Sequence, residues 1–318
     1  MKTLIAVLLA AAAVASAASA QIPQMPKPVI TDPGPEGVRV EQGGVFANYF
    51  AAPGEGRHPA ILLLGGSEGG LGGGAVRQAK ALKAHGFSVL QLAYFGAPGA
   101  PEALVEVPLE TFSRGIAWLQ AQPGVDGARI GLIGGSKGAE AALLVAAREP
   151  AIKAVAVGMP SSVLWPGISY TPQMKASWSA GGQPRPFLPY AFGSDYRNIY
   201  GAYANGLKAL ADHPDAVIPV ETINGPVMLV CGKADTLWPS CPMAEQVVAR
   251  LKGKGFKHPV QLMEYDDAGH AVFGPPVDKS NPAYPTLASL GGTADGNNAA
   301  RQDDWPRTLA FMDAELKR

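Results

Sequence analysis

The sequence predicts an α/β domain in which helices cover both faces of a mostly parallel central sheet. Short, wholly apolar segments such as 60–64 and 130–133 alternate along the chain with helical segments such as 139–147. Strands buried on both faces are continuous apolar runs, and their alternation with helices is typical of a parallel sheet. The composition agrees, because 47% of the 318 residues are hydrophobic and only 16% are charged.

The N-terminus has the pattern of a secretory signal peptide over residues 1–20. Lys2 supplies a positive start, residues 4–15 form a short apolar run, and Ala18-Ser19-Ala20 offers the small residues that a cleavage site needs. We expect cleavage after Ala20 and a secreted or periplasmic product. No other segment is apolar for long enough to span a bilayer, so no membrane span is expected.

The elements after the signal peptide follow in a regular order. Residues 21–37 are rich in proline and predict an extended leader, and the domain proper spans 38–318. It opens with a hairpin that turns at Gly43-Gly44. Further strands are expected at 60–64, 87–93, 130–133, 152–157, 227–231 and 260–264. Helices are expected at 76–85, 109–119 and 139–147, and parts of helices at 247–251 and 308–316.

One stretch, residues 159–205, interrupts this alternation and is rich in aromatic residues, proline and glycine. It lies between two predicted sheet strands, which indicates a cap inserted over the carboxyl edge of the sheet. Its aromatic side chains allow two interpretations. They form the core of the cap, as most aromatic residues do in proteins, or they form an apolar wall for an acyl chain.

The strongest motif is Gly134-Gly135-Ser136-Lys137-Gly138, which fits the pattern G-x-S-x-G. It lies between a buried strand and an alanine-rich helix, as a nucleophile elbow requires. The sharp turn needs small neighbours, which Gly134 and Gly138 provide, and the helix N-terminus favours negative charge on an oxyanion. The motif therefore predicts Ser136 as a nucleophile in an α/β-hydrolase fold.

A serine nucleophile needs a base and a carboxylate that orients the base, which in this fold follow in the order Ser, acid, His. Asp235 and His270 each lie in a loop directly after a predicted strand, on the same sheet edge as Ser136. They are the predicted acid and base. Asp266 and Asp267 are alternatives for the acid, but their closeness to His270 favours a role in shaping its turn.

An oxyanion hole needs two backbone N–H groups. We expect one from Lys137, the residue after the nucleophile, and one from Ser67 or Glu68 in the glycine-rich loop after the first long strand. A phosphate-binding loop is the other interpretation of these glycines, but neither a Gly-Lys-Ser/Thr ending nor a spaced G-x-G-x-x-G is present. No clustered metal ligands are evident, and we expect no cofactor.

Charge and cysteine content limit the remaining possibilities. The formal net charge is zero and no basic stripe is evident, so nucleic acid is not an expected partner. Cys231 and Cys241 are the only cysteines, and outside the cytosol such a pair can oxidise to a disulfide. Two buried free thiols are the alternative.

Several ordered segments resemble a known family over about residues 60–315. LGGSEGGLGGG, IGLIGGSKGAEAALLVAA, PVMLVCGKADTLWPS and YDDAGH are similar to the catalytic domain of type I acyl-coenzyme A thioesterases and bile-acid-CoA:amino-acid N-acyltransferases. The resemblance implies Ser136 as nucleophile, Asp235 as acid and His270 as base. The acyltransferase branch carries cysteine as its nucleophile, so Ser136 favours transfer of the acyl group to water.

We therefore predict a secreted serine hydrolase that cleaves small-molecule carboxylic esters or thioesters. Because export separates the protein from coenzyme A, and the predicted cap holds few basic residues (Lys175, Arg185 and Arg197), we expect a mostly neutral, apolar substrate. Dienelactone-hydrolase-like or peptidase-like specificity is one alternative. A non-catalytic binding protein on the same fold is another.

Overall fold

The computed structural model describes residues 27–168 and 173–317. The predicted signal peptide and its cleavage site after Ala20 lie outside the described residues, as does the first part of the predicted leader.

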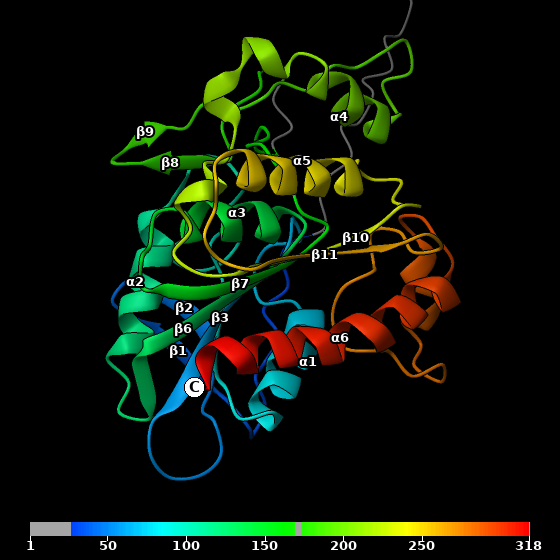
Figure 1. Ribbon diagram of the computed structural model, residues 1–318. Coiled ribbons are helices and arrows are strands. Elements are labelled where there is room, and N and C mark those ends of the chain that lie inside the picture. Colours follow the sequence, from blue (N-terminus) through cyan, green and yellow to red (C-terminus); the bar gives the residue numbers. More distant parts are fainter. Residues whose placement is uncertain (1–26, 169–172, 318) are drawn as a thin grey trace, which may run out of the picture.

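A twisted eight-stranded sheet forms the centre of the molecule, with strand order β1-β2-β4-β3-β6-β7-β10-β11 (Figure 1). The first pairings, β1 with β2 and β2 with β4, are antiparallel, and those from β4 to β11 are parallel. The strands are β1 Val38–Gln42, β2 Val45–Phe50, β3 His58–Leu64, β4 Ser88–Leu92, β6 Val125–Gly135, β7 Ile152–Gly158, β10 Val227–Gly232 and β11 Val260–Tyr265.

Helices cover both faces of this sheet, as predicted. Residues of α2 Glu110–Gln120, α3 Lys137–Ala146 and α5 Ser240–Gly253 pack in one apolar core. On the opposite face, α1 Gly73–Ala84 and α6 Ala294–Leu316 pack in a second core, and Figure 1 shows these two helices below the sheet. The segments 247–251 and 308–316, predicted as parts of helices, lie within α5 and α6.

The hairpin turns where the sequence predicted, since Gln42 pairs with Val45 across Gly43-Gly44. Both glycines have positive φ, at 60° and 72°, which a two-residue turn between antiparallel strands requires. The central strands are fully buried, so they could be recognised from sequence as short apolar runs.

The chain leaves the sheet after Gly158 and returns at Val227, so the insertion extends beyond the predicted 159–205. It contains β8 Trp178–Ala180, β9 Gln183–Pro184 and α4 Ile199–Leu207, followed by the 3-10 turns η1 Leu210–Asp212, η2 Pro214–Ala216 and η3 Val220–Thr222. β8 pairs with β5 Val107–Pro108, which ties the insertion to the body of the molecule. A last 3-10 turn, η4 Tyr284–Ala288, precedes α6.

The described part of the leader is extended and lies along the body, with a bridge between Ile30 and Leu71. Within residues 27–168 and 173–317, no helix is both long enough and apolar enough to cross a membrane.

Candidate active site

The nucleophile elbow joins β6 to α3 and holds Ser136 in a strained backbone conformation. Ser136 has φ 56° and ψ −125°, which places a non-glycine residue at positive φ. A Cβ on Gly134 would lie 2.2 Å from the carbonyl oxygen of Gly138, and a Cβ on Gly138 would lie 2.2 Å from that of Gly65. Both predicted glycines are therefore sterically required, since either methyl group would push the turn apart.

The three side chains predicted to act together form one hydrogen-bonded line. His270 Nε2 lies 2.9 Å from Ser136 Oγ, and His270 Nδ1 lies 2.8 Å from Asp235 Oδ2. Asp235 follows β10 and His270 follows β11, which are neighbours in the sheet. The carboxyl ends of parallel strands thus place residues that are far apart in sequence within hydrogen-bonding distance.

Asp235 is held by three further donors besides the imidazole. The amides of Leu237 and Trp238 donate to Oδ1 at 2.9 and 3.3 Å, and Ser240 Oγ donates to Oδ2 at 2.8 Å. The carboxylate is almost fully buried, so these bonds both fix its orientation and offset its desolvation. The neighbouring Ser240 contact could not be read from sequence, because hydroxyl residues are common in such loops.

The alternative acids lie on the surface. Asp266 is 81% exposed and pairs with Lys233 at 2.9 Å. The backbone carbonyl of Asp267 accepts a bond from the Thr293 amide, while its side chain is exposed. Among the described residues, neither carboxylate forms a hydrogen bond or an ion pair with His270.

The loop predicted to carry the second oxyanion donor lies beside the serine. A Cβ on Gly66 would lie 3.3 Å from Ser136 Cβ, and Tyr94 Oη is 2.7 Å from the Gly65 carbonyl oxygen. Among the described residues, no backbone acceptor is paired with the amides of Ser67 or Glu68. The Glu68 carboxylate itself accepts a bond from the Gly66 amide at 3.0 Å, which removes Gly66 as a donor.

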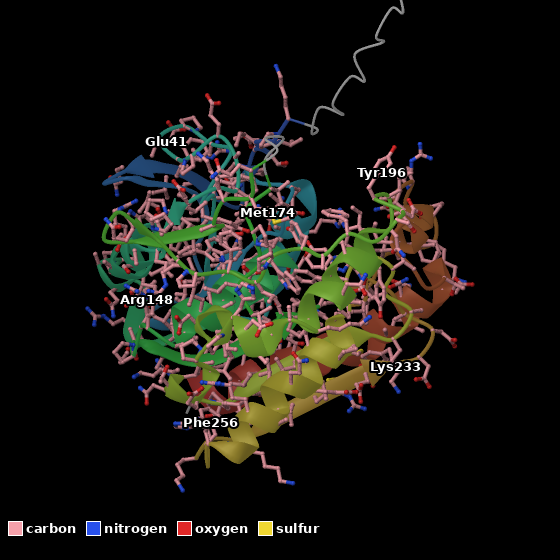
Figure 2. The ribbon with its side chains drawn as sticks, turned by 90° about the horizontal axis from the view of Figure 1, so that it is seen from above. Glu41, Arg148, Met174, Tyr196, Lys233 and Phe256 are labelled. Carbon is pink, nitrogen blue, oxygen red and sulfur yellow. A yellow bond between two sulfur atoms is a disulfide. The ribbon has the colours of Figure 1, made fainter. Side chains whose placement is uncertain are left out.

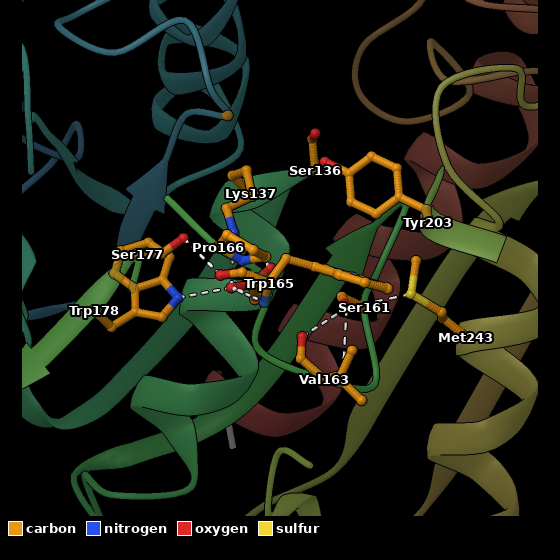
Figure 3. Close-up of polar contacts among 12 residues, drawn as sticks. Ser136, Lys137, Ser161, Val163, Trp165, Pro166, Ser177, Trp178, Tyr203 and Met243 are labelled. Atoms are coloured by element: carbon orange, nitrogen blue, oxygen red, sulfur yellow. Dashed lines mark hydrogen bonds and ion pairs between the residues drawn. The ribbon is translucent and has the colours of Figure 1, made fainter. Parts of the chain in front are cut away.

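Lys137 contributes its backbone at the elbow while its side chain turns into the interior. Its ammonium group bonds both carboxylate oxygens of Glu140, at 2.9 and 2.8 Å, and the pair is fully buried beneath Ser136 (Figure 3). Glu140 also accepts from the Trp178 indole at 2.7 Å and from the Trp165 amide at 3.2 Å. Burial raises the pKa of Glu140 and lowers that of Lys137, and their mutual attraction opposes both shifts.

Part of the aromatic set of the insertion forms a core, whereas Phe192, Tyr196 and Tyr200 are exposed. Trp165 and Trp178 are fully buried, and the Trp165 ring packs edge-on against Tyr203 at 4.8 Å between centroids. Tyr203 packs on Trp238, which contacts the His270 ring at 5.8 Å. At the outer edge, Tyr196 points away from the body (Figure 2). The insertion thus packs against His270 indirectly, through the Tyr203 ring and Trp238.

The cavity at Ser136 is lined mainly by parts of the chain outside the insertion, of which only Met159 contributes. It has a volume of about 310 Å³, and glycines 65, 66 and 135 are among its lining residues. The basic residues predicted to matter, those of the insertion, do not line it. Arg77 and Gln78 from α1 and Arg301 from α6 do. Sequence reasoning missed all three, because nothing in the pattern of an amphipathic helix shows which polar residue faces a cleft.

The two cysteines are joined in the structure as a Cys231–Cys241 disulfide, between the end of β10 and the start of α5. Over the described residues, one group has the spacing of a metal site: these two sulfurs with Glu264. Because the sulfurs are bonded to each other, they are not thiolate ligands in this state.

Comparison with protein families gives a match to the model described as "BAAT / Acyl-CoA thioester hydrolase C terminal" over residues 107–318. Acyl-coenzyme A thioesterase 6 of Mus musculus is 31% identical over 89% of this chain. Peroxisomal succinyl-coenzyme A thioesterase of Mus musculus is 28% identical over the same share. In both cases the chain spans 66% of the relative's length.

Among solved structures, the acylaminoacyl peptidase of Pyrococcus horikoshii aligns with a TM-score of 0.58 and 13% identity. The alignment covers 89% of this chain and 42% of the peptidase. At that identity the likeness concerns the fold, which is the α/β-hydrolase fold with its mainly parallel central sheet.

Proposed function

This chain belongs to the BAAT / acyl-CoA thioester hydrolase C-terminal family, and we propose that it is a serine hydrolase that cleaves carboxylic esters or thioesters through an acyl-enzyme. The observation that carries the proposal is the continuous line Ser136–His270–Asp235, with hydrogen bonds of 2.9 and 2.8 Å at an elbow of strained backbone. The names of the relatives point to acyl-CoA thioesters as one substrate class.

In the proposed mechanism, His270 Nε2 takes the proton from Ser136 Oγ as this oxygen attacks the substrate carbonyl. Asp235 holds the Nδ1–H tautomer and stabilises the imidazolium that forms. The amides of Lys137 and of Ser67 or Glu68 are the proposed donors to the oxyanion, since the carbonyl must lie between Ser136 and the glycine-rich loop. His270 then protonates the leaving group and activates water for deacylation, so no cofactor takes part in these steps.

We also propose that the protein is exported with loss of residues 1–20. The signal-peptide pattern and a Cys231–Cys241 pair that forms a disulfide both support this location. N-terminal sequencing of the protein from its native cell should then begin at Gln21. A mature chain that retains Lys2 would contradict the proposal.

A substrate panel tests the function. We expect Ser136-dependent hydrolysis of a simple acyl ester, of the matching thioester, or of both, and a loss of about 10⁴-fold or more in Ser136→Ala. Peptide and lactone substrates in the same panel separate the dienelactone-hydrolase-like and peptidase-like alternatives. If folded protein turns over no substrate and Ser136→Ala binds acyl compounds as the wild type does, the protein is a binding protein.

A further inference from the structure

The cavity at Ser136 holds a positive charge that the proposed mechanism does not use. Arg301 is partly buried, and it is fixed by bonds from Nε to the Ala271 carbonyl oxygen at 2.6 Å and from Nη1 to that of Pro275 at 3.2 Å. A guanidinium has five N–H groups, so donors remain for a ligand in the cavity that Arg301 lines. Both acceptors are neutral and leave its charge in place.

No carboxylate is hydrogen-bonded to Arg301 among the described residues. Across residues 27–168 and 173–317, neither the partly buried Arg301 nor the exposed Arg77 forms an ion pair. Asp304, one turn along α6, is buried, and burial raises its pKa to about 9, while the attraction of Arg301 opposes that shift. Burial also lowers the pKa of Arg301 to about 10, where it stays protonated.

Two other groups of the same cavity lack partners. Gln78 Nε2 is buried without an acceptor, and the amide belongs to a side chain that lines the cavity. Arg77 lies next to it on α1, and its positive charge acts on Arg301. The acidic residue of the lining, Glu68, is engaged by the Gly66 amide. The lining therefore contains two guanidinium groups and one carboxylate, and the Gln78 amide is a donor without a partner.

We propose that Arg301, Arg77 and Gln78 form an anion subsite for the acyl part of the substrate, and that the enzyme prefers acyl groups that end in a carboxylate. This inference rests on the proposed function. A carboxylate accepts hydrogen bonds from guanidinium and amide N–H groups together. One cavity of about 310 Å³ contains both these groups and Ser136, so the anion lies near the scissile carbonyl. The phosphates of coenzyme A, at the far end of the pantetheine arm, fit this position less well.

The test compares matched thioesters of N-acetylcysteamine: the adipic half-thioester, with a free carboxylate, and its neutral methyl ester. We expect wild-type kcat/KM to be at least about tenfold higher for the carboxylate form. Arg301→Met and Arg77→Met should each remove most of that preference, a loss of about tenfold, near the lower limit of the value of a hydrogen bond to a charged group. Arg301 also bonds the loop after His270, so Arg301→Met could fail to fold. In that case the result for Arg77→Met alone tests the subsite.

Arg307→Met is the matched control, because Arg307 lies on the same helix, pairs with Asp303 and is 61% exposed. It should keep the wild-type preference. A wild-type enzyme without a carboxylate preference, or one whose preference survives both cavity substitutions, overturns the subsite. A preference for hexanoyl-CoA over hexanoyl-N-acetylcysteamine that Arg77→Met removes would assign the arginines to the coenzyme phosphates and overturn the acyl assignment.

These outcomes differ from failure of the proposed function, in which no thioester or ester is hydrolysed in a Ser136-dependent way. In that case calorimetry with adipate monomethyl ester still tests the subsite. Binding by wild type that Arg77→Met weakens about tenfold or more supports the subsite, and equal binding by the two proteins overturns it.

Discussion

Asp235 and Glu140 are both buried carboxylates that hold a basic side chain close to Ser136. Only the base bonded to Asp235 also bonds Ser136. Asp235 bonds His270, whose second nitrogen is free to reach Ser136 Oγ at 2.9 Å. Glu140 bonds Lys137 with both oxygens and adds the Trp178 indole and the Trp165 amide, so its partners all lie in the interior. The first pair reaches the cavity through His270, and the second joins the elbow helix to the insertion.

The difference shows that burial and pairing alone do not identify a catalytic group. Both carboxylates are desolvated and hydrogen-bonded, and what separates them is whether the base retains an atom that faces the cavity. Lys137 has none, because its ammonium is enclosed by Glu140 (Figure 3). We therefore expect substitutions at Asp235 to affect turnover and substitutions at Glu140 to affect stability.

Asp235→Asn should produce the largest change. An amide at this position favours the wrong tautomer of His270, so kcat should fall about 10³- to 10⁴-fold while the fold is retained. Steady-state kinetics on the best substrate of the panel measures the loss. Asp266→Asn and Asp267→Asn are the controls, and if either of them caused the loss while Asp235→Asn did not, Asp235 would not be the acid.

Glu140→Gln should mainly destabilise the protein. The buried ammonium of Lys137 would lose its counter-charge, which typically costs about 3–5 kcal/mol of the free energy of unfolding. Urea denaturation followed by circular dichroism measures it. The double variant Lys137→Met/Glu140→Gln should recover much of the loss, because no charge is then left unpaired. A loss in Glu140→Gln below about 1 kcal/mol would contradict the structural role.

The Cys231–Cys241 disulfide should have a smaller effect on stability. It closes a loop with a sequence separation of 10, for which loop-closure entropy gives about 2–3 kcal/mol. Cys231→Ala/Cys241→Ala should therefore unfold at lower urea concentration, and wild-type protein from an oxidising compartment should resist alkylation without reductant. Two alkylated thiols in its mass spectrum would show that no disulfide forms.

Asp304 extends the comparison to a buried carboxylate with no side-chain hydrogen-bond partner among the described residues; burial raises its pKa, and the Gly274 amide and the charge of Arg301 oppose that shift. The folded protein keeps its proton up to about pH 9, whereas the unfolded chain releases it near pH 4. The free energy of unfolding should therefore fall as pH rises through this window, by at most about 1.4 kcal/mol per pH unit. Asp304→Asn should flatten that dependence in urea titrations from pH 5 to 8. An unchanged slope would mean that Asp304 is ionised in the folded protein.

The sequence predicted the central fold and the catalytic line because both depend on local patterns. The buried parallel strands were recognisable as apolar runs, and Gly134 and Gly138 marked the elbow. Both positions require glycine, because a Cβ on either residue would lie 2.2 Å from a backbone carbonyl oxygen. Asp235 and His270 followed from chain order and from their position after neighbouring strands.

The cavity lining was not predictable in this way. Arg77 and Arg301 are far apart in sequence and meet because α1 and α6 share one face of the sheet. The expectation of a neutral substrate used the basic residues of the insertion, but among the insertion residues only Met159, at its start, lines the cavity. The partners of Glu140 were equally hidden, since Trp165 and Trp178 reach it only after the insertion folds back.

The most direct measurement of the central claim, that Ser136 is a nucleophile activated by His270, is labelling with a fluorophosphonate probe followed by peptide mass spectrometry. We predict stoichiometric modification of the peptide that contains Ser136, no modification in Ser136→Ala, and much slower modification in Asp235→Asn. A hydrolytically active protein whose label lies on another residue, or that remains unlabelled at Ser136, would contradict the account.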